Sequence, residues 1–218
     1  MSNQNSTGSG FRPRKHADGR EYVGGGRPYY IPSTDSNNYF LGDVVTLKGA
    51  SNTADVTASG GVGGAVMFPA GTLPVVGAVT AGAGNAITGV IVHIGYDPVD
   101  YARPPYRKAS VNTVVWVEDS PDVIYEVRLV GATLLTSTGI NDTASVSLGA
   151  GGSTTTGTSS HGLDGTTLQT STGTTYQLRL VGLSRDLLNS DLTSANPNVF
   201  CKINVSTEQT MASTAIGS

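Results

Sequence analysis

Alternating apolar and polar residues are the main structural signal in this sequence, and they indicate β-strands rather than helices. Across 122–131 every second residue is Val, Tyr, Val or Leu, and the positions between them include a glutamate and an arginine. A period of two predicts a strand with one buried face. Only one short segment, 184–194, is a candidate helix, and an irregular loop fits it equally well. We therefore expect an all-β fold, a barrel or a sandwich. The same pattern, or a run that is apolar on both faces, predicts further strands over 41–48, 74–79, 86–96, 111–118, 175–185 and 199–206.

Glycine-rich segments separate these predicted strands. The chain has 29 glycines, and clusters at 60–64 and 82–85 interrupt it between strands. Residues 149–175 are almost wholly Gly, Ser and Thr, which bury little apolar surface, so we expect a long exposed loop or hairpin there. Charged residues make up 13% of the chain, too few for the solvated faces of a helical bundle, whereas an apolar content of 38% argues against full disorder.

The first 40 residues differ from the rest in charge and in pattern. Five basic and two acidic residues lie within 1–30, which leaves 8 basic and 14 acidic residues for the remainder. We therefore expect an extended N-terminal arm over 1–40, with 1–10 mobile, on a β body over 41–208 that precedes a loose tail over 209–218. The chain has no apolar run of 18 residues and no basic start followed by an apolar stretch, so we expect neither a membrane span nor a secretory signal.

The expected arm combines basic with aromatic side chains, which suits docking on another protein. Tyrosine and arginine are enriched among the residues that anchor interfaces, and extended segments of this kind order on a partner surface. Packing against the chain's own body is the alternative. Nucleic-acid binding is a weaker hypothesis, because the net charge of the first 30 residues is about +3 and the acidic body opposes it. The candidate docking residues are Phe11, Arg12, Arg14, Lys15, Arg20, Tyr22, Arg27, Tyr29 and Tyr30.

Signals of catalysis and of cofactor binding are weak. The sequence has no GxxxxGK phosphate-binding loop and no GxSxG nucleophile elbow, and a single cysteine, Cys201, excludes a cysteine-rich zinc site. Cys201 falls at an inward position of a predicted strand, and we interpret it as an inert core thiol. His161, Asp164 and a neighbouring serine have the composition of a hydrolase site, but we interpret them as the polar tip of a loop. We expect no enzyme activity, no metal and no cofactor.

Two further groups of polar residues have structural interpretations. The carboxylates of Glu118, Asp119, Asp122 and Glu126 surround a Ser-Pro turn signal between two predicted strands. We interpret them as a tight turn with cross-strand pairing, and a metal or acid–base site is the alternative. His93 lies in an apolar predicted strand and is interpreted as a hydrogen-bonded core or interface residue.

Short segments throughout the chain resemble the auxiliary capsid proteins, also called cement or head-decoration proteins, of tailed bacteriophages. Each match is short, but they occur in the same order from residue 11 to residue 204. The resembling segments are Phe11-Arg12-Pro13, 27–33, 40–43, 86–92, 106–110, 119–123, 125–127, 152–157 and 202–204.

The resemblance implies a non-enzymatic structural protein of the virion. Such a protein binds the outside of the shell made by the major capsid protein, bridges neighbouring capsomers and stabilises the head. We expect residues 11–40 to dock on that shell while the body self-associates as a dimer or trimer, without direct contact to nucleic acid or membrane. The alternative is a glycan-binding or adhesive surface module of the virion, in which Trp116, Tyr96, Tyr101 and Tyr106 stack on sugars.

Overall fold

The computed structural model confirms an all-β fold. It describes residues 9–59, 65–95, 104–131, 135, 139–168, 175–184, 191 and 194–208. In these ranges the regular structure is almost entirely strand, with a short 3-10 helix, η2 (Gly165–Thr167). The strands are β1 (Arg12–His16), β2 (Arg27–Ile31), β3 (Val44–Ser51), β4 (Val56–Ser59), β5 (Ala65–Phe68), β6 (Pro74–Ala78), β7 (Gly89–Ile94), β8 (Thr113–Glu118), β9 (Val123–Val130), β10 (Thr143–Ala144), β11 (Val146–Ser147), β12 (Gly162–Asp164), β13 (Leu178–Leu183) and β14 (Asn198–Ile203).

Five strands form a small closed barrel in the order β2-β6-β3-β7-β8, and β8 pairs back with β2. The β2–β6 pairing is parallel, whereas the other four are antiparallel. A barrel of this size has no lumen, because alternate side chains from each strand fill it. The buried residues of this core include Tyr29, Ile31, Tyr39, Val45, Val76, Ile91, Ile94, Val115 and Val117.

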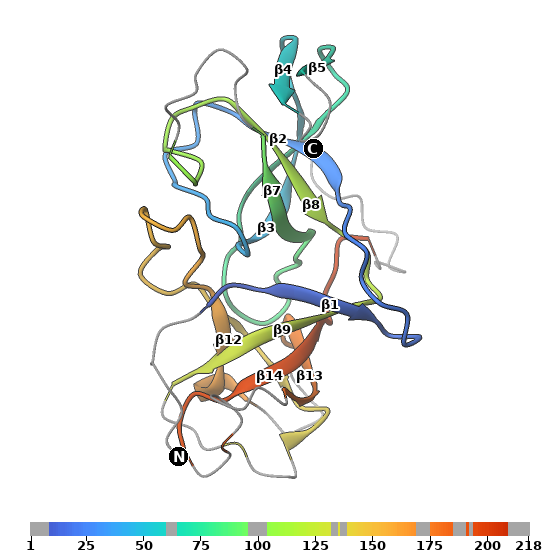
Figure 1. Ribbon diagram of the computed structural model, residues 1–218, viewed down its shortest axis with the longest axis vertical. Helices are drawn as coiled ribbons and strands as arrows, with labels where there is room; N and C mark the ends of the chain where they lie inside the picture. The colour runs from blue at the N-terminus through green and yellow to red at the C-terminus, as the bar shows by residue number, and fades with distance from the viewer. Residues whose placement is uncertain are drawn as a thin grey trace.

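A second sheet lies beside the barrel in the order β10-β13-β14-β9-β12-β11, and β1 also pairs with β9. The apolar positions of β9 predicted from alternation, Val123, Tyr125, Val127 and Leu129, are all buried in one core. Cys201 of β14 is buried in the same core, as predicted. Figure 1 shows β1, β9 and β14 running side by side in the lower half of the molecule.

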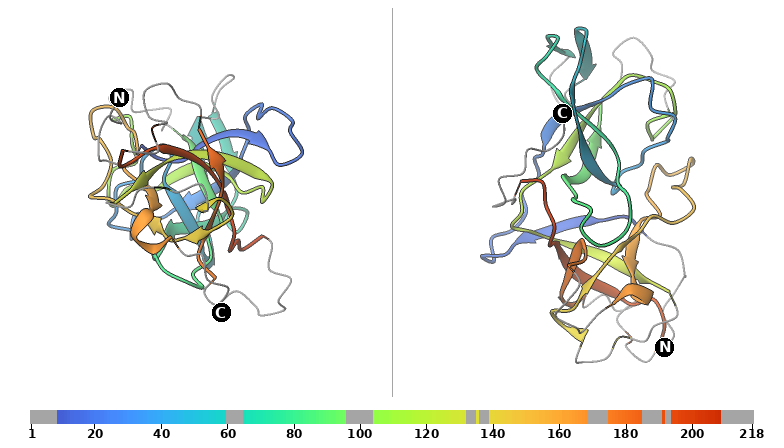
Figure 2. Two further views of the ribbon diagram at one scale, coloured as in Figure 1. Left: turned by 90° about the horizontal axis from the view of Figure 1, so that it is seen from below. Right: turned by 180° about the vertical axis from the view of Figure 1, so that it is seen from behind.

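The barrel and the second sheet, which we call the two lobes, share one continuous apolar core and are not separate units joined by a flexible linker. Val44, Val79, Ile87 and Val90 belong to the barrel half of the chain, yet they pack in the same cluster as the inward residues of β9 and β14. The right-hand view of Figure 2 shows the barrel and the second sheet next to each other along the long axis of the molecule. Because this junction is buried and apolar, the barrel and the second sheet hold each other in one orientation.

The hairpin of β4 and β5 covers part of the barrel's outer surface. Its Ala58 is buried in a small cluster with Tyr30, Val75 and Val114, against which Trp116 also packs. On the other face of the hairpin Met67 is 63% exposed. Trp116, suggested above for sugar stacking, therefore takes part in the packing between the hairpin and the barrel.

The N-terminal residues are not a separate arm, which differs from the sequence-based expectation. β1 pairs with β9 in the second sheet, and β2 pairs with both β6 and β8 to close the barrel. No structural boundary falls at residue 40, because strands on both sides of it belong to the same barrel. The alternating segments within 11–31 are too short, and too often interrupted by Pro and Gly, for alternation to reveal these strands.

The Gly/Ser/Thr-rich segment is partly exposed and partly buried. Residues 153–156 are exposed, as expected. β12, however, is inserted beside β9 as a parallel strand, and its Leu163 is fully buried. The candidate helix over 184–194 lies largely outside the described residues, and the tail over 209–218 lies wholly outside them. Of the mobile segment expected over 1–10, only the last two residues are described.

Candidate docking face and adjoining cleft

The nine candidate docking residues separate into buried aromatic and exposed basic side chains. Phe11, Tyr29 and Tyr30 are 2%, 4% and 8% exposed, so they cannot anchor on a partner and the docking prediction is wrong for them. Phe11 packs edge-on against Tyr125 of β9, with ring centroids 6.2 Å apart. Tyr22 is half-buried and packs against the same core. The alternative, packing against the chain's own body, therefore holds for the aromatic members.

The basic members lie at the surface on or near β1. Arg14, with 52% of its side chain exposed, forms an ion pair with Glu126, and Arg20 pairs with Asp18. The Arg12 guanidinium has no ion-pair partner among the described residues. Arg27 is also exposed, at the start of β2, and its Nε lies 2.7 Å from Oδ2 of Asp119.

Strand register places Lys15 and two further cations on the same sheet face. Phe200 of β14 lies opposite Glu126, and the Lys15 ammonium sits 5.7 Å from the centroid of the Phe200 ring. Lys202 is two residues beyond Phe200 and therefore points to the same side of the sheet. Arg179 of β13 is directly opposite Lys202. We call Lys15, Arg179, Phe200 and Lys202 the basic row.

Sequence reasoning found Lys15 but did not join it to Arg179 or Lys202. Alternation alone indicates that Lys202 points outward from its strand, because Cys201 and Ile203 point inward. It does not indicate which strand lies next to β14, and residue 15 is 187 positions away in the chain. The pairing of β14 with β9 and β13 decides that these side chains share one surface.

The acidic cluster is structural in most of its members. Glu118, Asp119 and Glu126 are 7%, 6% and 7% exposed. Asp119 accepts a 2.7 Å hydrogen bond from the Tyr29 hydroxyl, and Glu126 accepts hydrogen bonds from Arg14 and from the Ser184 hydroxyl. Asp122 is exposed. Within the described ranges no three His, Cys, Asp or Glu side chains converge closely enough to hold a metal ion.

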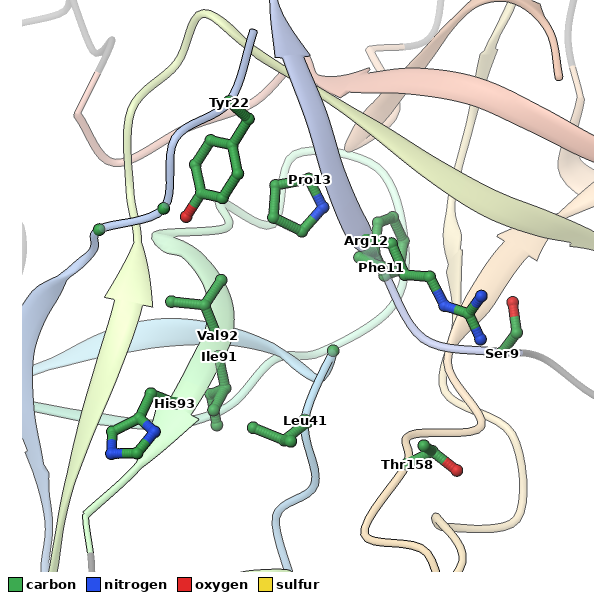
Figure 3. Close-up of a pocket in the computed structure, with 13 residues that line it drawn as sticks. Ser9, Phe11, Arg12, Pro13, Tyr22, Leu41, Ile91, Val92, His93 and Thr158 are labelled. Carbon is green, nitrogen blue, oxygen red and sulfur yellow. The ribbon is translucent and has the colours of Figure 1, made fainter. Parts of the chain in front are cut away.

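A cleft of about 470 Å³ lies at the junction of the two lobes, next to β1 (Figure 3). Its lining is mainly apolar, with Pro13 on the side of β1 and Leu41, Ile91 and Val92 on the side of the barrel. The Arg12 side chain extends toward Ser9 and Thr158, which also line the cleft. The lining comprises Ser9, Phe11, Arg12, Pro13, Tyr22, Gly24, Gly25, Leu41, Gly42, Ile91, Val92, His93 and Thr158.

Close backbone contact forms one end of this cleft. The Phe11 amide donates a 2.9 Å hydrogen bond to the Gly42 carbonyl. Gly10 and Gly42 have φ values of 71° and 90°, and a Cβ on Gly42 would lie 3.0 Å from the Gly10 Cα. Glycine is required at this crossing because an L side chain there would be both strained and obstructed.

Ser159, His161 and Asp43 form a buried network that lacks the geometry of a hydrolase site. The imidazole Nδ1 of His161 accepts a 3.2 Å hydrogen bond from the Val44 amide, and its Nε2 lies 3.5 Å from Oδ1 of Asp43. The Ser159 hydroxyl accepts a 2.9 Å hydrogen bond from the His161 amide. Both ring nitrogens are therefore engaged, and neither can take a proton from Ser159 as a general base.

Asp164, the other carboxylate considered near His161, has a separate structural role. Its side chain accepts hydrogen bonds from the amide and the hydroxyl of Thr166 at the start of η2. The contacts of His161 and Asp164 therefore do not form the dyad that their spacing in the sequence allows. The interpretation as a structural polar segment agrees with these contacts.

The remaining candidates for chemistry are also held in packing contacts. Burial raises the pKa of the Cys201 thiol well above its ordinary value, which opposes formation of the nucleophilic thiolate. The ring of His93 packs edge-on against Trp116, with centroids 5.0 Å apart. Tyr106 stacks on Phe40 with a centroid distance of 5.1 Å. The other two aromatic residues suggested for sugar stacking, Tyr96 and Tyr101, lie outside the described residues.

Comparisons with known proteins identify no relative. No model of a known protein family matches the chain, and neither a curated protein nor a solved structure is significantly similar to it. In the part of the chain that the structure describes, no helix has the length and apolar character needed to cross a membrane.

Proposed function

We propose that the protein is a structural component of a phage virion that binds the outer surface of the capsid shell and stabilises it. The observation that carries this proposal is the exposed basic face formed by Arg12, Lys15 and their neighbours on a sheet that is rigidly packed against the barrel. The order of short segments that resemble head-decoration proteins provides independent support.

The placement of side chains suits binding to a repeated surface. The basic groups project from paired strands, so little backbone entropy is lost when they bind, in contrast to an unstructured arm. The cleft beside Arg12 offers an apolar pocket of a size that accommodates a side chain of the shell protein. Many identical contacts on one shell act together, so each of them can be weak while the assembly is stable.

Cosedimentation with heads of the virus that encodes the protein tests this proposal. Purified full-length protein should sediment with heads that lack it, and these heads should then resist heating better than undecorated ones. A Leu41→Arg variant should bind less, because Leu41 is 39% exposed and lines the cleft. Lys108→Glu, an exposed change in the barrel half, serves as the control.

Failure of the wild-type protein to sediment with heads under low-salt conditions would refute the proposal. Binding of the purified protein to a glycan array, without binding to heads, would favour the adhesive module instead.

A further inference from the structure

The strongest unexplained feature is the direct opposition of two cations in the second sheet. Arg179 of β13 and Lys202 of β14 are register partners in an antiparallel pair. The Cβ atoms of residues paired in this way lie about 5 Å apart, and like charges at such positions destabilise a sheet. Neither side chain takes part in an ion pair with a described residue.

A third cation on the same face adds to the positive charge of this pair. Lys15 lies on the same face, above Phe200. Glu126, the acidic residue at the centre of this face, is buried and already engaged by Arg14. The backbones of Glu21 and Lys15 form an isolated antiparallel β-bridge, but no ion pair joins their side chains. Arg179 and Lys15 are exposed, and Lys202 is half-exposed.

We propose that the basic row binds an acidic protein surface, one that presents several carboxylates across a width of about four strands. This inference rests on the proposed function, in that it gives the chemistry of the partner surface. The sheet tolerates the repulsion between Arg179 and Lys202 in the free protein, and carboxylates of the partner remove it in the complex. The two cations thus cost fold stability and contribute to recognition.

An acidic protein fits this face better than a nucleic acid does. The row has three cations, whereas a protein that binds DNA largely through its phosphates makes roughly six to ten such contacts. Single strands are also bound by stacking on exposed aromatic rings, whereas the aromatic ring of the row, Phe200, is half-buried and lies under Lys15.

Charge reversal at one member separates recognition from folding. In Lys202→Glu a carboxylate lies opposite Arg179, so the melting temperature should stay the same or rise. Binding to poly-L-glutamate at low salt should weaken by about tenfold, which corresponds to about 1.4 kcal/mol. Lys202→Arg should retain binding, and Lys108→Glu is the matched control for the change in net charge.

Three results would overturn the inference. The first is unchanged binding of poly-L-glutamate by Lys202→Glu. The second is an equal loss of binding in Lys108→Glu, which would show an effect of net charge alone. The third is tighter binding of a single-stranded oligodeoxynucleotide than of poly-L-glutamate through the same residues, which would assign the row to nucleic acid.

The same variants distinguish this inference from the proposed function. If wild-type protein decorates heads and Lys202→Glu does so equally well, the basic row is not the contact although the proposed function stands. If the row binds poly-L-glutamate but the wild-type protein does not bind heads, the chemistry of the surface holds and the proposed function is wrong.

Discussion

The hydroxyl of Tyr29 donates a 2.7 Å hydrogen bond to Oδ2 of Asp119, and this contact joins β2 to the turn that follows β8. Arg27, two residues earlier, places its Nε 2.7 Å from the same carboxylate oxygen. Asp119 is 6% exposed, so the two partners compensate a carboxylate that has little access to water. The N-terminal part of the chain is thus bound into the barrel by charge as well as by backbone pairing.

Deletion of residues 1–40 should prevent folding rather than release an independent body. The deletion removes β2, so the barrel opens between β6 and β8, and it removes β1 from β9. Circular dichroism and thermal melting should show no cooperative transition. Deletion of residues 1–8, which removes none of the contacts described above, is the control. A cooperative melt in the larger deletion would mean that the remaining strands close a barrel without β2.

Substitution Tyr29→Phe should lower the free energy of unfolding by about 1–3 kcal/mol, because it leaves a buried carboxylate with one partner fewer. Urea denaturation at neutral pH measures this loss. Tyr30→Phe is a matched control, since Tyr30 is the adjacent buried tyrosine in β2 and no hydrogen bond of its hydroxyl is found among the described residues. Equal effects of the two substitutions would show that the bond to Asp119 contributes nothing measurable.

Arg107 should be among the most sensitive positions for stability. Its side chain is fully buried, and it donates to the carbonyl oxygens of Val111, Asp35 and Pro32 at 3.0, 3.0 and 2.8 Å. Its guanidinium also lies 5.6 Å from the centroid of the Tyr39 ring. Arg107→Met should cost about 3 kcal/mol or more, because it leaves three part-buried carbonyl oxygens without their donor, and an unsatisfied buried polar group costs about 1–3 kcal/mol.

The neighbouring position provides the control for Arg107. Lys108 is exposed, so Lys108→Met should change the free energy of unfolding by less than about 0.5 kcal/mol. Arg107→Lys should restore little of the loss, since an ammonium group lacks the planar fork that reaches several carbonyls at once. Full rescue by lysine would indicate that the segments around residues 32–35 and 111 are held by the positive charge rather than by the geometry of its donors.

Stability should fall as the pH is lowered from about 7.5 to 5.5. Burial lowers the pKa of His161, and the nearby Asp43 opposes this shift without reversing it. The unfolded chain, with a histidine pKa of about 6.5, therefore binds a proton more readily than the folded protein does. Protonation of Nδ1 would also break its hydrogen bond from the Val44 amide.

Urea denaturation at the two pH values measures this dependence. His93, whose pKa is also lowered by burial, contributes in the same direction. His161→Gln should therefore reduce the loss of stability on acidification, and His93→Gln should reduce it further. An unchanged pH dependence in the double variant would show that other groups cause it. Asp43 acts in the opposite sense at lower pH, because burial raises the pKa of its carboxyl group.

The strands that alternation predicts are those with an uninterrupted run of five or more residues. β9 falls within the predicted segment 122–131, and β13 falls within the predicted segment 175–185. β14 begins at Asn198, one residue before the predicted segment 199–206. β1 and β2 were missed because prolines at 13 and 28 interrupt short runs in which basic and aromatic residues are mixed. The short strands β10, β11 and β12 have two or three residues each, too few to show a period.

The candidate site could be predicted only in part for a related reason. Composition identifies the basic residues near the N-terminus, and the exposure of Arg12 and Lys15 agrees with that prediction. The sequence does not distinguish an aromatic residue that docks on a partner from one that packs in the core. Phe11, Tyr29 and Tyr30 are core residues because β1 and β2 lie against the rest of the protein.

The order of apolar and polar residues along the chain was sufficient to establish a β protein with glycine-rich turns, since alternation is a local property of an extended backbone. The tertiary structure decided which strands are neighbours. That choice closes the barrel with β2, buries the aromatic residues of the expected arm and sets Arg179 opposite Lys202. Strand pairing depends on contacts between residues far apart in the chain, and a local pattern carries no information about them.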